Sequence, residues 1–229
     1  MSIVFAHLQR FYSALARCSG EAPRQLCSCH GRLLWPNRGV YFFFEDGEVR
    51  SDSSPRVVRV GTHAVSLNSQ TTLWKRLSQH RGPVSGIGNH RGSIFRLHIG
   101  GALLTRDAGI LPAAGSWGNG AKPTSTPDVL AEGIVERAVS VHIGRMPLVW
   151  VDADDVPGRE SVRGVIERNA IALLTAARRA GLDPPSARWL GHSCPHPTVR
   201  TCGLWNVKHV DARYDPAFLD VMESLVPQR

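Results

Sequence analysis

Apolar residues recur at helical spacing in several parts of the chain. Near the N-terminus, Val4, Leu8, Phe11 and Leu15 define one apolar face between residues 2 and 17. A second stripe runs through a longer segment, residues 160–180, and further helices are predicted over 71–81, 130–142 and 216–225. A spacing of three to four residues is typical of helices with one buried side. The pattern therefore predicts at least five amphipathic helices.

Three short runs have the character of buried strands. They are continuous stretches of aromatic and β-branched residues at 39–44, 56–60 and 147–151. The first two are separated by the polar segment 45–48, which predicts a turn and a hairpin with a long loop. Together these elements predict a small α/β (α+β) fold, in which a mainly antiparallel three-stranded sheet is flanked by helices.

The spacing of these elements suggests a division of the chain. Residues 1–38 are expected to be a helical extension, 39–181 the core of the fold and 182–229 a tail that packs on the core. Within the core, residues 82–127 are rich in Gly, Pro, Ser and Ala in their second half, which predicts a flexible insertion. At 229 residues, the chain suits one domain with extensions better than two domains.

Charge is distributed unevenly. The net charge is +8, and residues 50–106 contain nine Lys or Arg but one acidic residue, Asp52. Such a block suits a polyanion, because Lys and Arg that neutralise nucleic-acid phosphates release counterions. The alternative is an ordinary solvated basic surface.

The sequence contains no run of 18 or more apolar residues, so no membrane span is predicted and no membrane partner is expected. Arg10 interrupts the continuous apolar core that a signal peptide would need, which favours a packed helix over a targeting peptide. Five cysteines without a secretion signal favour a reducing cytoplasm. A zinc site that unites Cys27, Cys29 and His30 with the Cys194 to Cys202 region is a disfavoured alternative, because Cys-x-Cys lacks the usual two-residue spacer.

Three side chains have the chemistry needed to hydrolyse a phosphodiester. Arg76 and His80 lie four residues apart, on one face of the predicted helix. A guanidinium grips phosphate oxygens as a planar fork, and an imidazole with an ordinary pKa of ~6.5 can bind phosphate or move a proton near neutral pH. On the long helix, Glu167 could be the only protein ligand of Mg²⁺ (or Mn²⁺), since that ion keeps several waters.

The order of these motifs resembles the GIY-YIG nuclease family. Gly39-Val40-Tyr41 matches the first family motif and Arg59-Val60-Gly61 the second, while the helix with Arg76 and the helix with Glu167 follow in the family's order. The resemblance covers roughly residues 39–180. The departure is Arg59, which replaces the tyrosine of the second motif and cannot act as a general base at neutral pH.

The resemblance implies a role for each matched residue. Tyr41 would activate or orient the attacking water, with His63 as the other candidate base, and Arg59 could still bind phosphate. Glu167 would hold the metal, and Asn206 would be the family's downstream amide. Expected contacts with nucleic acid are Lys75, Arg81, Asn89, His90, Arg91 and Arg96.

The sequence therefore predicts an endonuclease that uses a divalent metal to cut DNA, with RNA left open as a substrate. The rival is a binding protein on the same scaffold that has no catalysis, because Arg59 breaks the second motif. A third class is an interaction protein that is stabilised by metal through the Cys and His clusters. Zinc in the purified protein would distinguish it.

Overall fold

A four-stranded antiparallel sheet forms the centre of the molecule. The computed structural model describes residues 2–18, 23–158 and 160–227. The strands are β1 (Arg24–Gln25), β2 (Gly39–Val49), β3 (Pro55–Gly61) and β4 (Pro147–Asp152), in the order β1-β4-β2-β3. The expected hairpin of β2 and β3 is confirmed, with Tyr41 opposite Gly61. The expected number of three strands was too low, because the two-residue β1 is too short to leave a sequence pattern.

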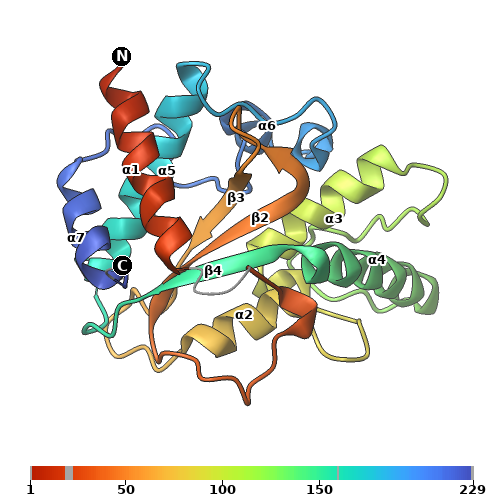
Figure 1. Cartoon of the computed structure of the whole chain (residues 1–229). Coiled ribbons are helices and arrows are strands. Elements are labelled where there is room, and N and C mark those ends of the chain that lie inside the picture. The colour runs from red at the N-terminus through yellow and green to blue at the C-terminus, as the bar shows by residue number, and fades with distance from the viewer. Residues whose placement is uncertain (1, 19–22, 159, 228–229) are drawn as a thin grey trace.

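Helices cover both faces of this sheet (Figure 1). One layer contains α1 (Ile3–Cys18), α5 (Val162–Arg179) and α7 (Ala217–Leu225), and the other contains α2 (Leu73–Arg81), α3 (Ile94–Arg106) and α4 (Thr126–Arg145). A short helix, α6 (Pro197–Cys202), and three 3-10 turns, η1 (Leu26–Ser28), η2 (His90–Gly92) and η3 (Leu190–Ser193), connect them.

The alternation of β2 side chains creates two hydrophobic cores. Val40 and Phe42 face the layer with α1 and α5, whereas Tyr41 and Phe43 face the layer with α2 to α4. Successive residues of a strand point to opposite faces, so a fully apolar run serves both cores. Tyr41 is thereby directed toward α2, which also carries Arg76.

The segment 82–127 differs from the expected flexible insertion. Its middle forms α3, whose Phe95, Ile99 and Leu103 are buried in the core. This helix contains Gly100 and Gly101, where a side chain at Gly100 would overlap the Trp117 ring and one at Gly101 would crowd Pro195. These glycines allow close packing inside a helix.

The acidic segment 45–48 also differs from expectation, because it belongs to β2. The pairing with β3 is irregular on both sides of Phe44, and two of the carboxylates, those of Glu45 and Glu48, have partners inside the protein. Glu48 is buried in an ion pair with Arg56, at 2.7 Å. Glu45 accepts hydrogen bonds from the indoles of Trp189 and Trp205.

Five of the nine basic residues in the block have acidic partners, and four of these partners lie outside it. Arg56 pairs with Glu48, and Arg96 pairs with Glu136 at 2.5 Å. Arg50, Arg91 and Arg106 also have acidic partners, namely Asp52, Glu132 and Asp107. Counting charges within residues 50–106 therefore overstated the cationic surface.

Within the described residues, no helix combines the length and apolarity that a membrane crossing requires.

Candidate active site

Two motif glycines allow the central strands to approach their neighbours. A Cβ at Gly39 would stand 2.6 Å from the Val151 carbonyl oxygen of β4. A Cβ at Gly61 would overlap the phenol of Tyr41, which lies across it from the opposite strand. Glycine in a strand often marks such close approach. Gly61 thus determines where the Tyr41 hydroxyl lies.

The Tyr41 hydroxyl belongs to a buried chain of polar groups. It lies 2.8 Å from Nε2 of His80, and Nδ1 of His80 lies 2.8 Å from Oγ of Ser93. Burial, together with the charges of Arg76, Arg59 and Arg96, lowers the pKa of His80 well below its ordinary value. His80 is therefore neutral at physiological pH and unfavourable as a proton acceptor.

Arg59 lies beside Tyr41 instead of the second tyrosine of the family motif. Its side chain is buried, donates to the Trp205 carbonyl and stacks 4.7 Å from the Phe95 ring centre. Burial lowers the pKa of Arg59, while the charges of Tyr41 and Glu167 oppose that shift. An arginine remains protonated at neutral pH, so a fixed positive charge faces the phenol.

Glu167 and Arg76 complete the cluster from two helices. The Glu167 carboxylate is partly buried, and its Oε1 accepts the Thr62 N–H at 3.2 Å. Burial raises the pKa of Glu167, although Arg59, Thr62, Arg76 and Lys208 act against that rise. Arg76 is held loosely by Gln79 at 3.0 Å and by the Gly92 carbonyl at 3.4 Å. The structure thus brings Tyr41, Arg59, Arg76, His80 and Glu167 together from four elements.

His63 is placed differently from the other candidate base. Its Nδ1 lies 2.8 Å from the Thr71 carbonyl, and its buried Nε2 has no partner within the described part of the chain. Burial is the main cause that lowers the pKa of His63 to about 4. An imidazole of that pKa is a weak base, so the geometry favours Tyr41 over His63.

Asn206 faces the backbone of β3. Its amide donates to the Val60 carbonyl at 2.8 Å, and its oxygen accepts the Val60 N–H at 3.1 Å. Trp205 continues this pairing through its own N–H to the Val58 carbonyl, at 2.8 Å. Both amide groups are thus engaged in holding the edge of the sheet, which favours a structural role for Asn206.

The residues expected to contact nucleic acid divide into two groups. Lys75 and Asn89 are exposed, and Arg81 is partly exposed. His90 and Arg96 are buried and both bind Glu136, and Arg91 forms a two-armed pair with Glu132. The expectation for His90 and Arg96 is corrected, because a side chain enclosed with its counterion cannot reach a substrate.

Three residues near the site carried no recognisable sequence signal. Ser93 fixes His80, Thr62 fixes Glu167 through its backbone, and Lys208 contributes charge near Glu167. Lys208 follows Asn206 by two residues, and only that proximity to a motif position could have singled it out.

The zinc alternative finds no support in the geometry. Among the described residues, no group of three or more His, Cys, Asp or Glu side chains could hold a metal ion. The thiol of Cys29 faces the Gln25 carbonyl, and that of Cys194 faces the His98 carbonyl.

The fold and the site define a nuclease-type α/β domain. A family profile described as GIY-YIG domain matches residues 3–229, which is almost the whole chain. The chain belongs to the GIY-YIG nuclease family. No curated protein and no solved structure matches the chain significantly.

Proposed function

We propose that this protein is an endonuclease that uses a divalent metal to hydrolyse phosphodiester bonds of DNA. The observation that carries the proposal is the convergence of Tyr41, Arg59, Arg76 and Glu167 from β2, β3, α2 and α5. Each of these positions matches a motif position of the family. Together they offer a base, one cation beside that base, one cation for phosphate and one carboxylate.

Glu167 has the properties of a ligand for a single Mg²⁺ or Mn²⁺ ion. Its Oε1 accepts one N–H, and no described residue donates a hydrogen bond to its Oε2. Mg²⁺ binds through one or two carboxylates and keeps waters and substrate phosphates as its other ligands. A partly buried carboxylate with a free oxygen fits that mode. The bound ion would supply charge stabilisation for the phosphate in the transition state.

Tyr41 is the candidate base, and His80 and Arg59 lie beside its hydroxyl. His80 is neutral, so its Nε2–H can donate to the Tyr41 oxygen while its Nδ1 accepts the Ser93 hydroxyl proton. Ser93 Oγ already accepts the Arg96 N–H as the N-terminal cap of α3, which leaves its own proton available. Arg59 places a fixed positive charge beside the Tyr41 oxygen, and His80 can offer that oxygen one hydrogen bond. From this position Tyr41 could orient the attacking water or help to deprotonate it.

Arg76 would bind the scissile phosphate. Its guanidinium is partly exposed and has no carboxylate partner among the described residues. Its bonds to Gln79 and Gly92 involve one nitrogen, Nη1, so other N–H groups remain for phosphate oxygens. Arg59 is enclosed, and we assign it to the stabilisation of Tyr41.

Cleavage of a supercoiled plasmid tests this proposal. In Mg²⁺ or Mn²⁺ the wild type should nick the plasmid, and Glu167→Gln and Arg76→Ala should each slow nicking by about a hundredfold or more. Chelation should stop the reaction. Lys122→Ala, which removes an exposed cation elsewhere, serves as the control. Nicking that survives both site substitutions would disprove the mechanism.

The second candidate is a DNA-binding protein without catalysis, and Arg59 is the observation that favours it. Replacing a motif tyrosine by a buried arginine removes one possible proton acceptor. Tight DNA binding without cleavage, in every metal and on every DNA tested, would select this alternative. Zinc found in protein that was purified without added metal would instead favour the third class, an interaction protein stabilised by metal.

A further inference from the structure

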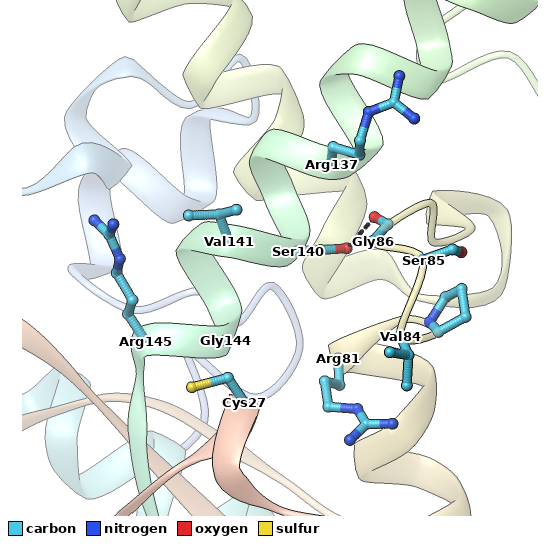
Figure 2. Close-up of a pocket in the computed structure, with 11 residues that line it drawn as sticks. Cys27, Arg81, Val84, Ser85, Gly86, Arg137, Ser140, Val141, Gly144 and Arg145 are labelled. Carbon is cyan, nitrogen blue, oxygen red and sulfur yellow. Dashed lines mark hydrogen bonds between the residues drawn. The ribbon is translucent and has the colours of Figure 1, made fainter.

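A groove of about 560 Å³ lies outside the site described above, between the C-terminal halves of α2 and α4 (Figure 2). Its wall is one face of α4, formed by Arg137, Ser140, Val141, Gly144 and Arg145. These positions are spaced by three, four, seven and eight residues from the first, so they share a helix face. Arg81 of α2 and the loop 83–86 form the opposite wall, and Cys27 lies at one end.

The floor of this groove is held in place by specific contacts. The Ser140 hydroxyl donates to the Gly86 carbonyl at 2.7 Å and accepts from Arg96 at 2.9 Å. Gly144 leaves room for Cys27, since a Cβ there would stand 3.2 Å from the Cys27 Cβ. Arg81 is fixed by its bond to the Cys29 carbonyl at 2.6 Å and lies over the Trp74 ring. The groove is therefore a built feature of the fold.

The charge of its own lining is positive, although Arg145 also borders a second pocket that is lined by Glu45, Asp46 and Glu48. The lining contains three arginines and no acidic residue, and among the described residues none of Arg81, Arg137 and Arg145 has a carboxylate partner. This contrasts with the rest of the basic block, to which Arg81 also belongs and in which most arginines are paired. The C-terminal ends of α2 and α4 contribute about half a negative charge each. A total of about −1 leaves the three positive charges mostly uncompensated.

The spread of the arginines favours an extended anion over a small one. Arg137 and Arg145 are eight residues apart, which corresponds to about 12 Å along the axis of α4. A nucleic-acid strand carries one phosphate per about 3.4 Å of helix axis, so this distance spans three to four nucleotides. A free phosphate could reach one of these guanidinium groups at a time.

We propose that this groove binds the phosphate backbone of a nucleic-acid strand, with Arg81, Arg137 and Arg145 as its ligands. The proposal rests on the proposed nuclease function and adds a second contact to it. The two sites are linked by α2, because His80 reaches Tyr41 while the next residue, Arg81, lines the groove. A strand held here would extend the footprint on DNA beyond the scissile phosphate.

Binding in the absence of metal tests the groove without requiring cleavage. The probe is a fluorescent DNA duplex in EDTA, titrated with wild type and with Arg137→Ala/Arg145→Ala. The double variant should bind about tenfold more weakly. In a plot of log affinity against log salt concentration, the magnitude of its slope should be smaller by about two. The matched control is Lys122→Ala/Arg188→Ala, which removes two exposed cations elsewhere and should leave both values unchanged. Equal affinity and salt dependence in the two double variants would overturn the proposal.

Cys27 offers a second readout that is specific to the groove. Its thiol is exposed, whereas Cys29, Cys194 and Cys202 are buried. DNA should slow alkylation of Cys27 in the wild type, as measured on its peptide by mass spectrometry, and should not do so in Arg137→Ala/Arg145→Ala. DNA that leaves alkylation unchanged would contradict the assignment. Inorganic phosphate is tested at the same phosphate concentration as the DNA. If it protects Cys27 equally well, the ligand of the groove is a small anion and the proposal of a nucleic-acid strand is wrong.

A variant that adds a negative charge to the groove tests the proposal without removing any arginine side chain that the fold might need. Val84 is 96% exposed, so Val84→Glu should fold normally and weaken DNA binding by adding a carboxylate to the groove. The tests also separate the two proposals. Binding that depends on the arginines without any plasmid cleavage contradicts only the nuclease function, while cleavage with unaltered binding in the arginine variants contradicts only the groove.

Discussion

Gly61 illustrates how the absence of a side chain can determine the position of a neighbouring side chain, here the proposed base Tyr41. The Tyr41 ring occupies the space that any side chain at residue 61 would need. The hydroxyl at the end of that ring is placed 2.8 Å from His80 by this packing. Glycine at this motif position is therefore needed because a side chain there would collide with Tyr41 of the neighbouring strand.

We therefore expect Gly61→Ala to reduce plasmid nicking by at least about tenfold, because the methyl group must displace the Tyr41 phenol. Gly133→Ala is the matched control. It lies in α4 with nothing near its Cβ, so it should keep activity and gain about 1 kcal/mol of stability. Nicking rates and urea unfolding of both variants check the prediction. Full activity of Gly61→Ala would show that the placement of Tyr41 is unimportant.

At the scale of elements, Asn206 joins the C-terminal segment to β3. Asn206→Ala removes both partners of the Val60 backbone, and buried groups left unsatisfied cost about 1–3 kcal/mol each. We expect a loss of about 2–4 kcal/mol in the free energy of unfolding, measured with urea. Asn119→Ala, at an exposed loop position, should change it little. Unchanged stability together with lost cleavage would instead place Asn206 in the chemistry.

Periodic elements were predictable, because each had a local pattern. The face that includes Leu8 and Phe11 of α1 and the run before Phe44 in β2 are both continuous signals in the sequence. α3 was missed because its glycines serve distant partners, Trp117 and Pro195, which no local pattern reveals. β1 was missed because two residues have no periodicity.

The candidate site was predictable where a family motif marks it and not elsewhere. Tyr41, Arg76 and Glu167 stood at motif positions. The role of Ser93 depends on a contact with His80 across 13 positions of the chain, and the burial of Arg96 depends on Glu136, 40 positions away. Contacts of that range arise only from the assembled fold.

At the scale of the whole molecule, buried imidazoles make the fold sensitive to acid. Burial lowers the pKa of His63 to about 4, and burial, His196 and Arg59 lower the pKa of His98 to about 4. In the unfolded chain both titrate near ~6.5. Their depressed values mean that the unfolded state binds protons first as the pH falls. The stabilisation is fully present above about pH 6.5 and is lost progressively toward pH 4.

Each histidine can therefore cost up to about 3 kcal/mol at the acidic end of this range. We expect the free energy of unfolding in urea to fall between pH 6.5 and pH 4.5, and to fall less steeply in His98→Gln. His30→Gln, which changes an exposed imidazole, is the control and should follow the wild type. Identical pH profiles for His98→Gln and the wild type would contradict the assignment.

The segment around Trp205 and Asn206 has one more consequence. β3 lies at the edge of the sheet, and its Val57, Val58 and Val60 would make it an attractive template for a strand of another copy. Because residues 205 and 206 pair with its backbone, that row of hydrogen-bonding groups is already occupied. At the opposite edge, β1 offers only two residues. The contacts that hold β3 in place thus also cover the edge at which the sheet could otherwise pair with a strand of another molecule.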